Sequence, residues 1–125
     1  PDDVQSDIRN DSQIIWTDFQ NSDMEYFYSM MNVYVLASYR EGFPTGVLEA
    51  QSMEIPVITT YATGCCDSIL ENVTGLFVEP NVEQLAIAIR SIHDGKTRID
   101  SKEARTWVRD NFENHIVWKE IEKLY

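Results

Sequence analysis

Two carboxylates in this chain flank a turn that leads into a short helix, a place where strand–loop–helix units bind ligands. Glu41 and Glu49 stand eight positions apart in the stretch SYREGFPTGVLEAQSMEIPVI, residues 38–58. A carboxylate suits a vicinal diol, because it can accept a hydrogen bond from each of the two hydroxyl groups. Spacing alone equally allows a simpler interpretation, in which Glu49 complements a helix dipole and Glu41 is a solvated loop charge.

The elements that must position these carboxylates are two strands and a helix. Residues 33–37 read VYVLA and residues 56–61 read PVITTY. Runs that are apolar on both faces are typical of strands buried in a parallel sheet. Residues 38–55 between them are long enough for a helical crossover, which should be right-handed.

Within this crossover the helix should begin at about Thr45, since Gly42, Pro44 and Gly46 prevent an earlier start. Thr45 is a suitable N-cap residue. Glu41 would then lie on the loop and Glu49 in the early turns of the helix, at the carboxyl end of the sheet, where such folds bind ligands. The free amides at the helix start favour an anion, typically a phosphate.

The sequence of this segment closely resembles the E-x7-E signature of the retaining glycosyltransferases of family four. Those enzymes have two Rossmann-like domains that face each other across a cleft, the B-type glycosyltransferase fold. The resemblance continues through TTYATGCCDSILENVTGLFVEPNVEQLAIAI and runs backward through IIWTDFQNSDMEYFYSMMNVYVLAS. It covers about residues 14–95 and identifies the chain as the C-terminal, donor-binding part of such an enzyme.

The resemblance implies a role for each residue of the segment. The family's catalytic carboxylate falls on Glu41 and contacts hydroxyl groups of the donor sugar. Its second glutamate falls on Glu49 and holds the ribose hydroxyls of the nucleotide. The turn whose amides approach the diphosphate and the sugar corresponds to Gly42, Phe43, Pro44, Thr45 and Gly46.

The implied reaction moves a hexosyl group from a UDP- or GDP-linked donor to a hydroxyl acceptor with retention of configuration. It needs neither a metal nor a further cofactor. The members most similar in wording build bacterial surface polysaccharides. The implied partners are the nucleotide sugar and an N-terminal acceptor domain, which the chain lacks together with the first strands of the donor domain. We therefore expect little or no transferase activity from these residues alone.

Three positions depart from the family pattern. Glu54 and Asn72 stand where glycine is usual, and both sites call for a left-handed backbone. Cys66 replaces an arginine in a loop that should lie beside the Glu41 loop.

The predicted fold is α/β, a partial Rossmann-like domain of about four mostly parallel strands with helices on both faces. Residues 1–13 read as a polar lead-in, residues 14–95 as the nucleotide-sugar-binding portion and residues 96–125 as C-terminal helices. The strands are expected at residues 14–19, 33–37, 56–61 and 75–78. Capping pairs at Ser22 with Glu25 and at Asn81 with Gln84 should open two helices. Phe27, Met30 and Met31 should form the apolar face of the first.

Composition narrows the function further. The chain has 125 residues, which predicts one domain, and a net charge of −11. Such charge excludes a nucleic-acid partner, which requires a basic surface.

No apolar run reaches the length of about 18 residues that a membrane span needs. Cys65 and Cys66 are adjacent and read as reduced thiols of a cytoplasmic protein. The complete enzyme would be peripheral at the inner membrane.

Two alternatives stay open. An open sheet edge invites pairing, so the chain could be a non-catalytic interaction module that forms a homodimer. The same fold also carries nucleotide-sugar epimerases, which the E-x7-E wording disfavours.

Overall fold

The computed structural model describes residues 2–17 and 22–124. The helices and strands, in chain order, are α1 (Asp2–Asn10), α2 (Met24–Met30), β1 (Tyr34–Leu36), α3 (Thr45–Ser52), β2 (Val57–Thr60), β3 (Gly75–Val78), α4 (Val82–His93), α5 (Ser101–Phe112) and α6 (Asn114–Glu122).

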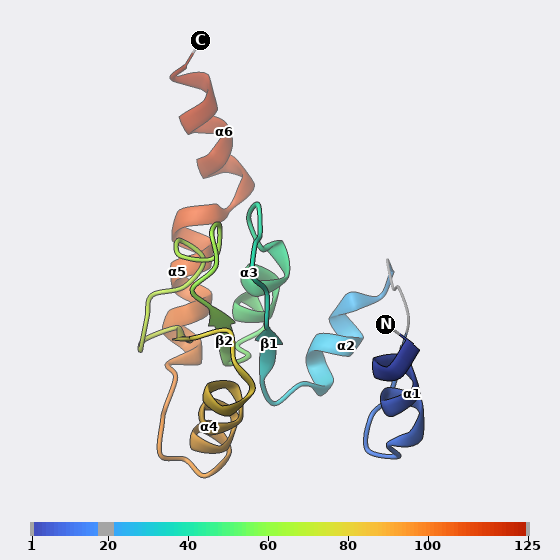
Figure 1. The fold of residues 1–125 in the computed structure, drawn as a ribbon. Helices are drawn as coiled ribbons and strands as arrows, with labels where there is room; N and C mark the ends of the chain where they lie inside the picture. The colour runs from blue at the N-terminus through green and yellow to red at the C-terminus, as the bar shows by residue number, and fades with distance from the viewer. Residues whose placement is uncertain (1, 18–21, 125) are drawn as a thin grey trace.

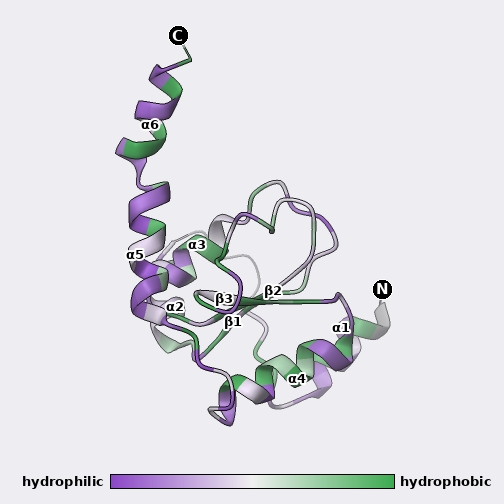
Figure 2. Ribbon diagram, turned by 90° about the vertical axis from the view of Figure 1, so that its left-hand side faces the viewer, coloured by the Kyte–Doolittle hydropathy of each residue, from purple (hydrophilic) through white to green (hydrophobic). Residues whose placement is uncertain are grey.

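The three strands of the described residues form one parallel sheet in the order β1-β2-β3. Helix α4 covers one face and α3 the other, as Figures 1 and 2 show. Each crossover between strands is long enough to hold a helix or a folded loop, which parallel pairing requires. The α/β fold with helices on both faces is confirmed.

The expected strand at residues 14–19 is wrong for its described part. Residues 14–17 form no strand, and the amide of Ile14 donates to the carbonyl of Asp11 in a turn. The side chains of Ile15 and Trp16 are 84% and 62% exposed. An apolar run predicts burial, but it forms a strand only beside a neighbour that satisfies its backbone. Residues 18 and 19 lie outside the described residues.

Alternation along the strands builds two cores. Tyr34, Leu36, Val57 and Phe77 pack on the α3 side. The intervening residues face α4, because successive strand side chains point to opposite faces; they include Val33, Val35, Ile58, Leu76 and Val78. Leu85, Ile89 and Ile92 of α4 pack against this second core, as their helical spacing predicts.

Helix starts agree with the sequence in part. Asn81 caps α4 by accepting from the Gln84 amide at 2.8 Å, as expected. Helix α3 begins at Thr45, but its N-cap residue is Pro44, so the predicted capping by the Thr45 hydroxyl is wrong. The N-cap of α2 is Asp23 in left-handed geometry, with no side-chain cap, so Ser22 does not open that helix.

The backbone is left-handed at both positions where glycine is usual in the family. The φ angle is 61° at Glu54 and 62° at Asn72. Asparagine tolerates this geometry, whereas glutamate adopts it at a cost of about 1–2 kcal/mol. The Glu54 carboxylate accepts from the Arg105 guanidinium at 3.3 Å, an exposed ion pair that joins the end of α3 to α5.

The inward face of α2 differs from the prediction. Its one buried residue is Tyr28, whereas Met30 is exposed.

Toward the other end of the chain, α5 packs on α3 through Ala104 and Val108, and α6 extends away from the body of the molecule (Figure 2). Large apolar side chains stand exposed on and after α6, namely Val117, Trp118, Ile121 and Leu124. Within residues 2–17 and 22–124, no helix combines the length and the apolar character that crossing a membrane requires.

Candidate functional site

The loop that carries Glu41 is held by the loop that follows β2. The Glu41 amide donates to the carbonyl of Thr63 at 2.9 Å, and the backbones of Arg40 and Thr63 form an isolated parallel bridge. The Thr60 hydroxyl donates to the carbonyl of Ser38. The two loops therefore lie side by side at the carboxyl end of the sheet, as the sequence predicts.

Gly64 fits closely against the Glu41 loop. A Cβ at this position would lie 2.3 Å from the carbonyl oxygens of both Glu41 and Gly42. Its φ is +88°, a region that favours glycine. The close contact at Gly64 thus determines how near the Glu41 loop lies to the loop that follows β2. Sequence reasoning assigned it no role, although the TGC wording at residues 63–65 was a signal for it.

The carboxylate of Glu49 is fixed by a tyrosine from another helix. Glu49 lies exposed on α3, and the hydroxyl of Tyr28 on α2 donates to its Oε2 at 2.7 Å. Tyr28 itself is 5% exposed. This partner was missed from the sequence, because the two residues are 21 positions apart.

A second tyrosine, Tyr34, is influenced by the charges of both carboxylates. The rings of Tyr28 and Tyr34 are 6.1 Å apart. A Cβ at Gly46 would lie 2.5 Å from the Tyr34 hydroxyl oxygen and 3.6 Å from that of Tyr28. Burial, followed by the charges of Glu49 and Glu41, raises the pKa of Tyr34. Both glutamates therefore lie within electrostatic range of the same phenol.

The tyrosines should make stability depend on alkaline pH. Burial first, then the hydrogen bond to Glu49, raises the pKa of Tyr28, and burial also raises that of Tyr34. Unfolded tyrosines lose their protons at about pH 10. Above that pH the unfolded state binds fewer protons than the folded state, so the free energy of unfolding should fall. Denaturation at about pH 9 and about pH 11 should show a smaller fall in the Tyr28→Phe, Tyr34→Phe double variant, since the loss begins at the unfolded pKa of about 10.

The turn between the glutamates presents backbone amides. Within the part of the chain that the structure describes, no acceptor binds the amides of Gly42, Phe43 and Gly46. Pro44 is buried, and the ring of Phe43 lies 5.5 Å from that of Phe112 on α5. The turn is thereby anchored on its apolar side, while free donors remain at the start of α3, where the helix dipole favours an anion.

Gly42 offers a test of ligand approach, because nothing lies within 4 Å of a Cβ added there. The fold itself places no demand on a glycine at this position. We expect Gly42→Ala to change the free energy of unfolding by less than about 0.5 kcal/mol. It should nevertheless weaken nucleotide-sugar binding, measured by calorimetric titration, because a methyl group would keep the ligand from the backbone. Unchanged affinity would mean that no ligand approaches Gly42.

A groove of about 600 Å³ lies beside Glu49. Glu49 and Thr45 line it, whereas Glu41, Gly42, Phe43, Pro44 and Gly46 do not. Its apolar walls come from α2, α3 and α5 and include Met24, Tyr28, Leu48, Met53, Val108 and Phe112. The predicted site residues are therefore contiguous in the chain but divided in space, with Glu49 at the groove and Glu41 on the clamped loop.

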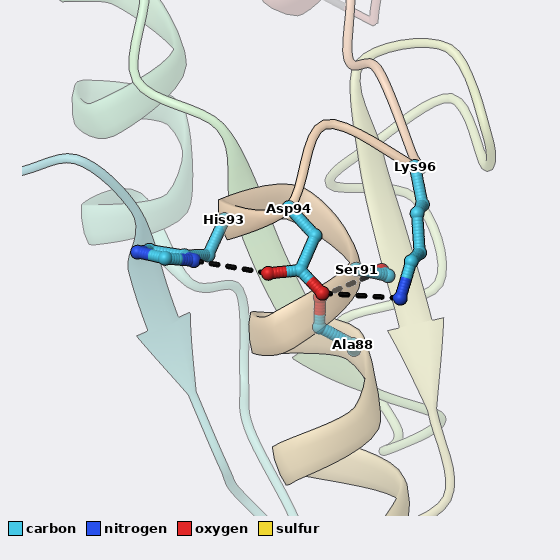
Figure 3. Close-up of polar contacts among 5 residues, drawn as sticks. All are labelled: Ala88, Ser91, His93, Asp94 and Lys96. Carbon is cyan, nitrogen blue, oxygen red and sulfur yellow. Dashed lines mark hydrogen bonds and ion pairs between the residues drawn. The ribbon is translucent and has the colours of Figure 1, made fainter.

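A polar cluster of His93, Asp94 and Lys96 lies at the end of α4 and forms no site. The Asp94 carboxylate binds His93 Nδ1 at 3.2 Å and Lys96 Nζ at 3.1 Å (Figure 3). These hydrogen bonds, that of His93 foremost, lower the pKa of Asp94. Ser91 donates to the carbonyl of Ala88 at 2.8 Å rather than to the imidazole. The His93 side chain is 85% exposed, so the cluster is a solvated helix end and no nucleophilic triad.

Comparison with known proteins shows the family to which the chain belongs. Residues 6–110 match the family described as glycosyl transferases group 1. The capsular polysaccharide biosynthesis glycosyltransferase CapM of Staphylococcus aureus is 34% identical over 116 residues, covering 83% of this chain and 28% of CapM. The chain thus spans little more than a quarter of the length of this relative.

Solved structures share the fold. Sucrose-phosphate synthase of Thermosynechococcus elongatus is 28% identical with a TM-score of 0.82, over 99% of this chain and 32% of that enzyme. HepE of Anabaena, solved in complex with UDP-glucose, is 19% identical with a TM-score of 0.82, over 98% of this chain and 36% of HepE. At the latter identity the likeness concerns the fold alone.

Proposed function

This chain belongs to the glycosyl transferases of group 1, and we propose that it is the part of such an enzyme that binds the nucleotide-sugar donor. The observation that carries the proposal is the placement of the E-x7-E pair. Glu41 lies on a loop clamped at the carboxyl end of the parallel sheet, and Glu49 lies at a groove with its carboxylate held by Tyr28. Folds of this kind bind ligands at that end of the sheet.

Each group would contact one part of the donor. Glu49 would accept hydrogen bonds from the ribose hydroxyls, and Glu41 from those of the sugar, because each carboxylate has two oxygens that can accept. The free amides of Gly42, Phe43 and Gly46 would stabilise the diphosphate. The UDP-glucose complex of HepE, which has the same fold, supports a ligand of this class.

The complete enzyme would transfer a hexosyl group to a hydroxyl acceptor with retention of configuration. As the diphosphate departs it gains negative charge, and donors already aimed at it lower the barrier. The chain has 10 lysine and arginine residues against 21 acidic ones, so its net charge of −11 does not favour the departing anion. Further positive charge would come from the missing part of the enzyme, together with the acceptor site, so we expect these residues alone to bind donor without transferring sugar.

We place the complete enzyme in bacterial surface polysaccharide synthesis, in the cytoplasm and peripheral to the inner membrane. The similarity to CapM, a capsular polysaccharide glycosyltransferase, supports the pathway class. The cysteines Cys65 and Cys66 are both free thiols, consistent with a reducing compartment.

Calorimetric titration with UDP, GDP and their common sugar conjugates tests the proposal. We expect saturable binding of one nucleotide, with an affinity that changes when its sugar is attached. The Glu83→Ala variant serves as control, because Glu83 is exposed at the start of α4, on the other face of the sheet. Absence of binding by all these ligands at millimolar concentration would contradict a donor site in this chain.

The alternative is a non-catalytic module that pairs with a second copy. One observation favours it, since among the described residues β1 pairs only with β2 and leaves its other edge open. Sedimentation equilibrium distinguishes the two functions. Tight self-association without nucleotide binding would favour the module, and a monomer that binds nucleotide would favour the donor site.

A further inference from the structure

Glu49 is exposed, yet one of its carboxylate oxygens is fixed from the core. The Tyr28 hydroxyl donates to Oε2 at 2.7 Å across the gap between α2 and α3. Among the residues that the structure describes, Oε1 receives no hydrogen bond or ion pair. The orientation of the free oxygen therefore depends on where Tyr28 places its hydroxyl.

Tyr28 has little freedom to move. Its ring belongs to the core formed with Val47, Ala50, Ile55, Val57 and Ile69. Tyr34 lies beside it, and both hydroxyl groups abut Gly46, where an added Cβ would lie 3.6 Å from the Tyr28 oxygen. To hold a binding group in one geometry, the residue that donates to it must itself have a rotamer that is locked by packing.

We propose that Tyr28 is a positioning residue for nucleotide binding: its hydroxyl occupies Oε2 of Glu49 and turns Oε1 toward a ribose hydroxyl. The inference rests on the proposed function, because it takes ribose as the partner of Glu49. A free glutamate on a helix samples several rotamers and must lose this freedom when it binds. Tyr28 removes part of that cost beforehand, which corresponds to between about twofold and tenfold in affinity.

The phenol remains a donor throughout the neutral range. Burial is the main cause that raises the pKa of Tyr28, and the hydrogen bond to Glu49 adds to it. In the hydrogen bond between the two groups, the protonated phenol donates and the carboxylate accepts. The remaining lone pairs of Glu49 are then available to accept hydrogen bonds from ligand hydroxyls.

The test compares two ligands that differ only at the ribose. UDP and 2′,3′-dideoxy-UDP, and the corresponding guanosine pair, are titrated into the wild-type chain, Tyr28→Phe and Tyr26→Phe. Tyr28→Phe keeps the ring in the core and should weaken the ribose nucleotide between about twofold and tenfold, with no effect on the dideoxy analogue. Tyr26 is exposed on the same helix, so Tyr26→Phe should change neither. Equal weakening of both ligands would reveal a merely structural role and overturn the inference.

A second measurement separates this inference from the proposed function. Three-bond NMR couplings of Glu49 should report one χ1 rotamer in the wild-type chain and averaging in Tyr28→Phe. Averaging in the wild-type chain would overturn the positioning role whether or not nucleotide binds. A fixed rotamer in a chain that binds neither UDP nor GDP would refute the proposed function instead, and the assignment of ribose would fail with it.

Discussion

Replacing Glu49 with alanine is expected to weaken nucleotide binding by about ten- to a hundredfold, because a hydrogen bond to a charged group contributes about 1.5–3 kcal/mol. The variant also leaves the Tyr28 hydroxyl without its acceptor at the groove. Calorimetric titration of the variant with the nucleotide that the wild-type chain binds measures the effect. Glu49 is exposed, so the fold should tolerate the change.

Two matched variants sharpen this result. Glu49→Gln keeps the shape but donates where the carboxylate accepts, and it should lose nearly as much affinity as alanine. Glu83→Ala removes an exposed carboxylate from α4 and should bind as tightly as the wild-type chain. If Glu49→Ala bound nucleotide with unchanged affinity, Glu49 would not be a ligand group, and the interpretation of the E-x7-E pair would fail at this residue.

Gly64→Ala is expected to lower the free energy of unfolding by about 2–5 kcal/mol, the combined cost of left-handed strain and overpacking. The new methyl group would lie 2.3 Å from the carbonyl oxygens of Glu41 and Gly42, which are backbone atoms and cannot rotate away. The Glu41 loop must therefore move. Urea denaturation measures the stability, and the ratio of UDP-sugar to UDP affinity measures the displacement of Glu41.

Gly95→Ala separates strain from displacement. Gly95 has a φ of +68°, but nothing lies within 4 Å of an added Cβ. This variant should cost only about 1–2 kcal/mol and leave the affinity ratio unchanged. Equal losses in the two glycine variants would show that the contact between Gly64 and the Glu41 loop contributes nothing beyond backbone geometry.

The strands and helices around the site were predictable because their signals are local. The apolar runs at residues 33–37, 56–61 and 75–78 correspond to β1, β2 and β3. Continuous apolarity on both faces is what a strand buried between two helical layers needs. The left-handed backbone at Glu54 and Asn72 was also foreseeable, because glycine is usual there in the family that the sequence resembles.

The contacts that fix the carboxylates were not predictable in the same way. Helix α2 reads MEYFYSM, in which five of the seven positions are apolar or aromatic. Helical periodicity then fixes the spacing of the buried face but not its phase. Met30 was assigned inward and Tyr28 was overlooked, although Tyr28 is the residue that reaches Glu49. The contact of Gly64 with the Glu41 loop could not be predicted either, because it depends on two loops that the sheet brings together.

The most direct test of a donor site is chemical-shift mapping of the isotope-labelled chain with UDP-glucose and GDP-mannose. We expect saturable shifts in the amides of residues 41–49 and of the adjoining Thr63 and Gly64, with little change on α4 and α6. Shifts confined to α6, or to the outer edge of β1, would contradict it and place any binding on an interaction surface instead.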